Sequence, residues 1–281
     1  MDDSVEVFGF SIPVRRHSRQ GRPSQVKAPV QFQVLNFFHG KAIRHVKIAI
    51  SGTYSAGKTS TVMALSRYTG VPRTLARTIR EILPEAVPGK ALAEVTPAEF
   101  LQLMLRRHTG RAVQEALLGD HFISDGSSLQ EWLYGAGRVI HGMNPNANAG
   151  NAGGRAVVQD EEMQFFAKAV DQYALALKSH VKSTYDAYVH LEHELPIAAD
   201  GHRPMNDGFR ATIDKMLLQT LDELEIPYYI VRGTMSERLT RICELFDLKP
   251  VLGLDEAIEL ARQDYAAQDF RLETERVATA A

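Results

Sequence analysis

The sequence predicts an α/β fold in which a parallel β-sheet is packed between two layers of helices. Short runs rich in β-branched and aromatic residues recur along the chain, and they alternate with longer segments that have helical spacing. The first buried run, residues 46–51, ends at a glycine that opens the pattern G-x-x-x-x-G-K-T, which is typical of the turn between a strand and a helix. Alternating strands and helices favour a parallel sheet with helices on both faces.

Composition restricts the class of protein. The chain has 281 residues, 44% of them hydrophobic and 23% charged, and a formal net charge of -2. These values are ordinary for a globular protein and give no overall field that would attract nucleic acid or an acidic membrane. The single cysteine, Cys243, excludes an internal disulfide, and no apolar run approaches the ~20 residues of a membrane span. The acidic N-terminus lacks a signal-peptide pattern, so we expect a cytoplasmic protein.

The segment from Gly52 to Thr59 predicts a phosphate-binding loop. Gly52 and Gly57 allow the backbone to curl, so that its N–H groups point at phosphate oxygens, and the following helix adds a partial positive charge. Lys58 can reach the β- and γ-phosphates, and the Thr59 hydroxyl can bind Mg²⁺. The residues expected to contact the nucleotide are Gly52, Thr53, Ser55, Ala56, Gly57, Lys58, Thr59 and Ser60. We therefore predict a nucleoside triphosphate with Mg²⁺ as the cofactor; the absence of an N-K-x-D motif favours ATP over GTP.

Residues 1–45 differ from the rest and predict an N-terminal extension. Residues 5–10 and 30–34 alternate as short strands do, and the basic stretch 15–22 lies between them. That stretch is either an arm for an anionic partner or a solvated linker, and we favour the linker. The extension can pair with the main sheet or form a contact in a homo-oligomer. We place the nucleotide-binding domain at residues 46–250 and a C-terminal helix and polar tail at residues 251–281.

The region after the loop predicts a helix, a second strand and a further helix. The helix runs over residues 59–68 and is closed by Gly70, a short strand follows at 72–75, and residues 76–83 are helical. Arg77 and Arg80 are three positions apart and share a helix face, where they can hold an anionic substrate group or simply face solvent.

A capping box, T-x-x-E, begins the next helix at Thr96, and that helix continues toward Leu117. The buried strand 121–124 then ends at Asp125. A carboxylate at this edge of an open α/β sheet can hold Mg²⁺ or accept the proton of an acceptor hydroxyl. Alternatively, Asp125 starts a turn or caps the helix over residues 128–139. We include Ser127 with Asp125, Arg77 and Arg80 in the predicted acceptor-binding set.

The second half of the chain supplies candidate arginines. Residues 141–154 are small and polar and form either a flap over the acceptor or a surface loop, and a long amphipathic helix begins near residue 160. After the strand 185–191, the loop 195–210 carries Arg203 and Arg210, which can close onto the triphosphate and stabilise charge on the transferred phosphoryl group. Arg210 can equally lie only in the first turn of the following helix.

The last strand covers residues 227–232, and the loop that begins at Gly233 is expected to line the nucleotide base. Helices are predicted at 237–246 and 254–266. His190 and His193 flank Glu192 without the spacing of H-E-x-x-H, so we predict no metal site there.

Taken together, these stretches resemble the NadR-type, ribosylnicotinamide-kinase-like domains within the nucleoside and nucleotide kinase branch of P-loop proteins. The likeness spans residues 46–246 and leaves the first 45 unmatched. It rests on four stretches: residues 50–59, 123–129, 185–210 with Asp200-Gly201-His202-Arg203, and 226–233. It implies a P-loop NTPase three-layer sandwich with a five-stranded parallel sheet, and Mg-ATP-dependent phosphorylation of a small, nucleoside- or sugar-like hydroxyl compound. It also implies that Arg203 sits in a lid over the phosphates.

The chain departs from the family pattern on the acceptor side. Gly126 stands where the family commonly has the arginine of Asp-Arg-Ser, and Thr74 replaces the usual acidic residue before Ala-Arg. The resemblance therefore indicates the type of reaction more clearly than the identity of the substrate. The alternative function is a regulatory switch that binds and hydrolyses ATP to control a protein partner.

Overall fold

A computed structural model describes residues 5–7, 10–12, 45–145, 160–192 and 206–268. Contacts divide the chain into two units, Met1–Lys41 and Ala42–Ala281. In the first unit, β1 (Val5–Val7) and β2 (Phe10–Ile12) form an antiparallel pair in which Val5 lies opposite Ile12. The sequence predicts one strand over residues 5–10, and the structure instead has two separate strands, the second of which extends to Ile12. The predicted strand 30–34 and the basic stretch 15–22 lie outside the described residues.

The second unit is built on a sheet of four parallel strands in the order β4-β3-β5-β6. The strands are β3 (Lys47–Ser51), β4 (Phe122–Asp125), β5 (Ala187–Leu191) and β6 (Tyr228–Val231). Central β3 pairs with β4 on one side, where Ile50 lies opposite Asp125, and with β5 on the other, where Ser51 lies opposite His190. Because the strands are parallel, their carboxyl ends meet at one edge of the sheet.

Helices connect these strands in chain order. They are α1 (Lys58–Thr69), α2 (Ile79–Ala86), the short 3₁₀ helix η1 (Leu92–Glu94), α3 (Pro97–Leu118), α4 (Ser128–His141), α5 (Glu161–Thr184), α6 (Asp207–Glu223), α7 (Met235–Phe246) and α8 (Leu254–Ala266).

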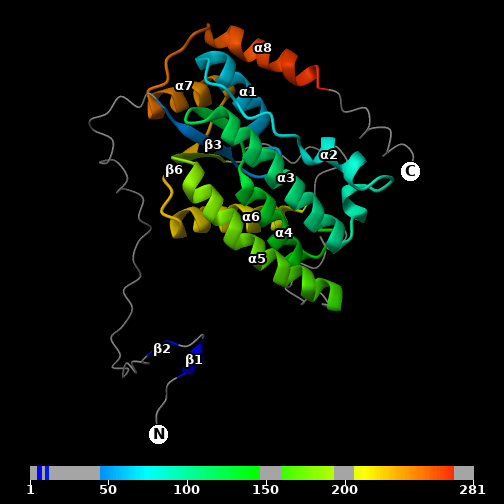
Figure 1. Cartoon of the computed structure of the whole chain (residues 1–281). Coiled ribbons are helices and arrows are strands. Elements are labelled where there is room, and N and C mark those ends of the chain that lie inside the picture. Colours follow the sequence, from blue (N-terminus) through cyan, green and yellow to red (C-terminus); the bar gives the residue numbers. More distant parts are fainter. Residues whose placement is uncertain (1–4, 8–9, 13–44, 146–159, 193–205, 269–281) are drawn as a thin grey trace. The chain divides into compact units, whose positions relative to one another are not determined.

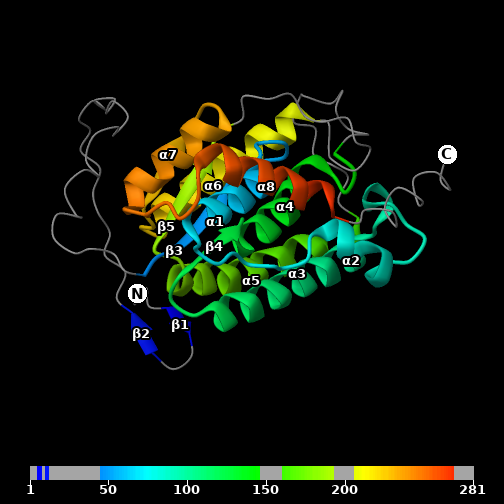
Figure 2. The ribbon, with the colours of Figure 1, turned by 90° about the horizontal axis from the view of Figure 1, so that it is seen from above.

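The helices form a layer on each face of the sheet, as Figures 1 and 2 show: α1, α7 and α8 on one face and α3 to α6 on the other. The alternation of side chains along β3 explains the two layers. Ile48 and Ile50 belong to the core with α1, α7 and α8, whereas Ala49 belongs to the core with α3 to α6. The described residues therefore form a three-layer α/β/α arrangement, as the sequence predicts.

The resemblance implied five strands, but the sheet of the described residues has four. The segment predicted as a strand at 72–75 makes only a single parallel bridge, between Arg73 and Ile123. Thr74 N–H donates to the Ile123 carbonyl and Ile123 N–H donates to the Pro72 carbonyl, both at 2.9 Å. Pro72 has no N–H with which to extend the ladder, and Thr78 soon caps α2. In place of the expected strand, this segment forms a single parallel β-bridge beside β4.

The predicted helix signals are present in the structure. The Thr96 side chain accepts a hydrogen bond from Glu99 N–H, and the Glu99 carboxylate accepts one from Thr96 N–H at 2.8 Å. Gly70 closes α1 in the left-handed conformation (φ 71°) and donates to Ser66 O. The boundaries of α2 and α6 differ from the predicted 76–83 and 211–224, because Thr78 and Asn206 provide the N-caps.

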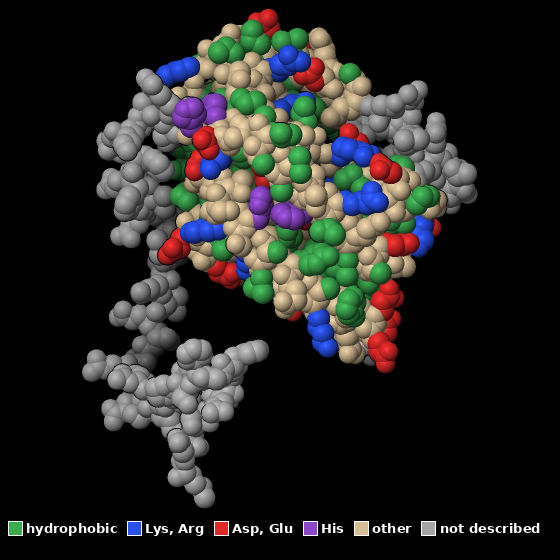
Figure 3. Space-filling model, in the orientation of Figure 1, with side chains coloured by type: hydrophobic (Ala, Val, Ile, Leu, Met, Phe, Trp, Pro, Cys, Tyr) green, Lys and Arg blue, Asp and Glu red, His purple; other side chains and the backbone are tan. Residues whose placement is uncertain are grey.

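Acidic and basic side chains are interspersed on the face of the molecule drawn in Figure 3. Within the described part of the chain, no helix combines the length and the apolar character needed to cross a membrane.

Candidate nucleotide-binding site

The loop between β3 and α1 has the backbone of a phosphate cradle. Gly52 adopts φ 140° and Gly57 adopts φ 84°, so both lie in regions that favour glycine. A Cβ at Gly52 would lie 2.8 Å from the backbone oxygen of Leu191 in β5, so any other residue would force this backbone to shift. Ser55 also has a positive φ of 63°. The loop thus curls tightly into the N-terminus of α1, where N–H groups and the helix dipole favour an anion.

Lys58 and Thr59, the first residues of α1, lie where the motif predicts. Lys58 Nζ donates to the backbone oxygen of Thr53 across the loop at 2.8 Å. Thr59 Oγ1 donates to Asp125 Oδ2 at 2.6 Å. The structure therefore brings together the two residues expected to hold magnesium. Thr59 lies in the first turn of α1, and Asp125 is the last residue of the neighbouring strand β4. Ser60 follows them in the first turn of α1.

Arg111 of α3 supports the end of β4 beneath Asp125. Its side chain is buried, and Nη1 donates to the Asp125 backbone oxygen at 2.9 Å and to the Ser124 hydroxyl at 3.0 Å. Nη2 lies 3.4 Å from Glu131 Oε1, so the buried guanidinium has a carboxylate partner. Arg111 fixes the backbone that carries Asp125. Sequence reasoning missed it, because its inward orientation follows from helix packing and no motif marks it.

A buried polar network joins the loop to α6. Arg210 Nε donates to Thr53 Oγ1 at 3.0 Å, and Thr53 Oγ1 donates to Asp214 Oδ2 at 3.3 Å. Across from them, His190 lies 3.3 Å from Ser51 Oγ through Nδ1 and 3.6 Å from Asp214 Oδ1 through Nε2. Burial lowers the pKa of Arg210, and the charge of Asp214 opposes this change. Arg210 lies in the first turn of α6, as one sequence interpretation had it, and its side chain also contacts the loop. Ser51 and Asp214 were not predicted.

A second unpredicted arginine supports the loop from α7. Arg238 is buried, and its Nη1 donates to the backbone oxygen of Ala56 at 2.8 Å. Gly233, expected near the nucleotide base, has φ 91° and directly precedes Thr234, the N-cap of α7. The loop is therefore held from α6 and from α7 as well as by its own glycines.

The predicted acceptor residues have varied surroundings. Arg77 is exposed, and its guanidinium contacts Glu85 at 2.8 Å and the Glu81 backbone oxygen. Ser127 is fully buried and caps α4, with its hydroxyl also bonded to Gln130 at 3.0 Å. We therefore leave Ser127 out of the proposed acceptor-binding residues. Ser127, and not Asp125, is the N-cap of α4. The side chain of Arg80, the whole of Arg203 and most of the 141–154 stretch lie outside the described residues.

An aromatic stack lies beside the loop. The ring of Tyr54, within the loop, stacks on Tyr134 of α4 with centroids 4.8 Å apart and planes at 10°. Phe209 of α6 lies 6.5 Å from Tyr54 in a similar orientation. Burial raises the pKa of Tyr134 well above its ordinary value, so its hydroxyl is neutral. Stacked rings of this kind combine apolar faces with polar hydroxyl groups at their edges.

The donor set near the loop fits magnesium. A hydroxyl and a carboxylate are hard oxygen ligands, and Mg²⁺ in phosphate-transfer sites commonly uses one or two protein ligands together with the phosphates. Among the residues that the structure describes, no group of three histidine, cysteine or acidic side chains could hold a metal ion on its own.

A strand, a glycine-rich cradle, a lysine at the start of a helix and a carboxylate on the adjacent strand define a P-loop protein that binds a nucleoside triphosphate. The family model AAA_28, described as an AAA domain, matches residues 47–238, and the chain belongs to this family. Comparison with curated proteins gave no match.

Solved structures of similar fold share little sequence with the chain. Deoxyadenosine kinase from M. mycoides with bound dATP has 15% identity and a TM-score of 0.50, with 72% of this chain and 99% of that chain covered. NadR protein in complex with NAD and AMP-PNP has 12% identity and a TM-score of 0.47, with 73% of this chain and 50% of that chain covered. At 15% identity, the likeness to the deoxyadenosine kinase extends to the fold alone.

Proposed function

We propose that this protein is a Mg-ATP-dependent kinase that transfers the γ-phosphoryl group of ATP to a hydroxyl of a small, nucleoside- or sugar-like metabolite. The observation that carries the proposal is the 2.6 Å hydrogen bond from Thr59 to Asp125 directly beside Lys58. This hydrogen bond brings together a hydroxyl and a carboxylate, which are ligands that Mg²⁺ prefers. Both lie at the ligand-binding edge of the sheet, next to the phosphate-binding loop. The deoxyadenosine kinase structure, whose fold is similar, gives the proposal a precedent by analogy only.

The phosphate-binding loop and the residues beside it are proposed to bind the triphosphate and its magnesium ion. The loop N–H groups of Gly52, Ser55, Ala56 and Gly57 bind phosphate oxygens, and Lys58 Nζ exchanges its bond to the Thr53 carbonyl for the β- and γ-phosphates. Thr59 and Asp125 would hold Mg²⁺, which when bound neutralises charge on the phosphates.

Asp125 is also the candidate base that accepts the proton of the acceptor hydroxyl. Arg210, which lies against Thr53, and Arg203 are proposed to stabilise charge on the transferred group. The stack of Tyr54 and Tyr134 is proposed to receive a planar or ring-shaped acceptor, because such a surface excludes water and offers a face for stacking. Arg77 and Arg80 remain proposed contacts to an anionic substrate group.

Mass spectrometry of reactions with Mg-ATP and a panel of nucleosides, sugars and hydroxylated metabolites tests the proposal. We expect one acceptor to gain the mass of a phosphate, and the product to disappear with Lys58→Ala and with Asp125→Asn. Asp120→Asn is the matched control, since Asp120 is exposed and lies just before β4. Full turnover in the Lys58→Ala protein would refute the proposed kinase mechanism.

A regulatory ATP switch is the second candidate. Residues 1–41 form a contact unit of their own outside the family match, which provides a segment on which a nucleotide-dependent signal can act. This function predicts release of ADP and free phosphate with no labelled acceptor, and hydrolysis whose rate depends on a protein partner. A phosphorylated small molecule in the same assay excludes it as the main activity.

A further inference from the structure

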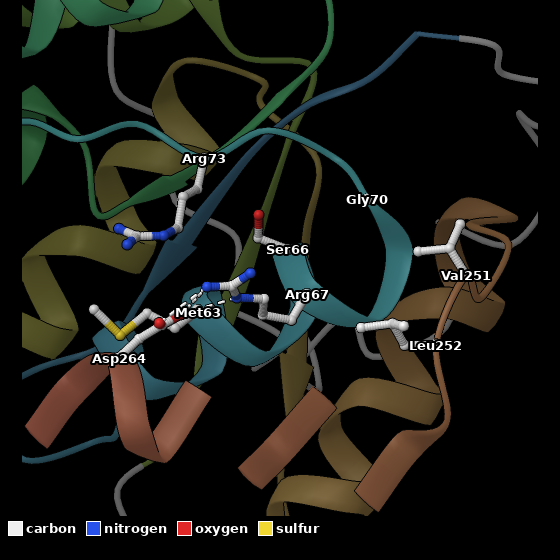
Figure 4. Close-up of a pocket in the computed structure, with 8 residues that line it drawn as sticks. All are labelled: Met63, Ser66, Arg67, Gly70, Arg73, Val251, Leu252 and Asp264. Atoms are coloured by element: carbon white, nitrogen blue, oxygen red, sulfur yellow. Dashed lines mark hydrogen bonds and ion pairs between the residues drawn. The ribbon is translucent and has the colours of Figure 1, made fainter. Parts of the chain in front are cut away.

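A pocket of about 310 Å³ lies between the C-terminal half of α1, the segment that follows it, and α8. Figure 4 shows its lining, which combines charged groups with the apolar side chains of Met63, Val251 and Leu252. The pocket is separate from the phosphate loop, because it involves α1 from Met63 onward, whereas the loop meets that helix at Lys58.

One arginine of the pocket is neutralised within the protein. Arg67 Nε and Nη2 donate to the two oxygens of Asp264, each at 2.9 Å, in a bidentate pair that joins α1 to α8. The hydrogen bond from Arg67 lowers the pKa of Asp264, and the positive charge of Arg73 adds a smaller lowering. Asp264 is therefore ionised, and both of its oxygens already have a guanidinium partner.

Arg73 supplies a second guanidinium, whose charge acts on the already paired Asp264. Its side chain forms no hydrogen bond or ion pair with any residue in the described part of the chain, and it is only partly exposed. In Figure 4 its guanidinium extends to the same side as the guanidinium of Arg67 and the carboxylate of Asp264. The single parallel bridge to Ile123 fixes the backbone from which the Arg73 side chain extends.

We propose that this pocket binds a small metabolite with an oxyanion head, either a phosphomonoester or a carboxylate, on a compact apolar body. The pocket carries a net charge of about +1, since Arg67 and Asp264 offset each other and Arg73 remains. The guanidinium of Arg73 offers the forked donor geometry that both head groups accept. Met63, Val251 and Leu252 supply the apolar wall for the body of the ligand. The inference does not depend on the proposed kinase activity.

Calorimetric titration of the full-length protein with benzoate, phenyl phosphate and benzamide tests this assignment. Mg-ADP is kept saturating, so that the phosphate loop is occupied. The three probes share one ring and differ in the head group. We expect benzoate or phenyl phosphate to bind and the neutral benzamide not to bind; the better anion identifies the head group. No binding of either anion up to about 10 mM, or equal binding of benzamide, overturns the proposal.

Variants test the charges separately. Arg73→Gln is expected to weaken anion binding at least about tenfold, because a charge-assisted pair is lost. Arg262→Gln is the matched control, since Arg262 lies on α8 and is exposed beside Glu259. Asp264→Asn is expected to tighten binding several-fold, because it frees Arg67. Unchanged affinity in Arg73→Gln, or equal weakening in Arg73→Gln and Asp264→Asn, contradicts recognition by these charges.

A measurement on the unaltered protein makes the test independent of how the variants fold. Phenylglyoxal modifies accessible arginines, and peptide mass spectrometry reports the extent at each position. We expect the bound anion to slow modification of Arg73 and to leave Arg262 unaffected. Equal rates at Arg73 with and without the anion that binds in calorimetry place that anion elsewhere and overturn the assignment.

Discussion

Thr59 and Asp125 are 66 positions apart, and the hydroxyl of the first donates a 2.6 Å hydrogen bond to the carboxylate of the second. The contact is a consequence of strand pairing. Asp125 lies opposite Ile50 in the β3–β4 register, and the chain returns from β3 through the glycine-rich loop to Thr59 at the start of α1. The two oxygens therefore meet at the carboxyl edge of the sheet.

Thr59→Ala and Thr59→Ser should differ in their requirement for magnesium. Alanine removes the hydroxyl, so we expect the Mg²⁺ concentration for half-maximal turnover to rise at least about tenfold, whereas serine keeps it within about threefold. Magnesium titrations of ATP turnover at saturating ATP measure this. An alanine variant with the magnesium dependence of the original protein would show that Thr59 is not a ligand.

Gly52→Ala should destabilise the protein by about 2–4 kcal/mol, because the new Cβ would meet the Leu191 backbone oxygen at 2.8 Å and alanine disfavours φ 140°. Gly89→Ala is the control that separates the steric clash from the backbone strain. Gly89 has φ 79° but open space around its Cβ position, so this substitution should cost only about 1–2 kcal/mol. Denaturant unfolding of both variants gives the comparison. Equal losses would mean that the close approach to β5 contributes nothing.

Two helix glycines should respond to alanine with opposite signs. A Cβ at Gly137 of α4 would lie 2.7 Å from side-chain atoms of Ile213 and Phe209, so Gly137→Ala should destabilise by about 1–3 kcal/mol. Gly110 of α3 has nothing within 4 Å of that position, and Gly110→Ala should stabilise by about 0.5–1 kcal/mol. Thermal unfolding distinguishes the variants, and stabilisation by both would contradict the tight packing of α4 on α6.

The stability of the fold should depend on pH through His108. Burial, followed by the nearby His180, lowers the pKa of His108, whose Nδ1 lies 2.8 Å from Ser128 Oγ. At a pH between this lowered value and the unfolded value of about 6.5, the unfolded chain binds more protons, so the free energy of unfolding falls as pH decreases. His108→Gln should lose less stability between about pH 7.5 and pH 5.5 than the original protein. Denaturant unfolding at both values checks this, and parallel losses would exclude His108 as the source.

The parts of the site that could be predicted are those encoded by local chemistry. The phosphate loop, the strand end at Asp125 and the capping box at Thr96 depend on residue types at fixed spacings, and each is found where expected. The expected second strand failed for a local reason as well, since Pro72 cannot donate to a ladder.

The supporting side chains could not be predicted. Arg111, Asp214 and Arg238 come from three different helices, and their contacts with the site depend on how those helices pack on the sheet. An arginine on an amphipathic helix is ordinarily a surface residue, so no pattern distinguishes these buried ones. Arg210 was ambiguous for the same reason, and its hydrogen bond to Thr53 depends on the position of α6.

Helix α1 has 12 residues and is therefore about 18 Å long, with the phosphate cradle at its first turn and Arg67 in its last. A ligand held by Arg73, beside Arg67, would thus lie at the opposite end of this helix from the nucleotide. If occupancy of one end changes affinity at the other, thermodynamic reciprocity requires the same factor in both directions. The concentration of the small anion would then set how much ATP the protein binds, and the level of ATP would set how strongly the anion is retained.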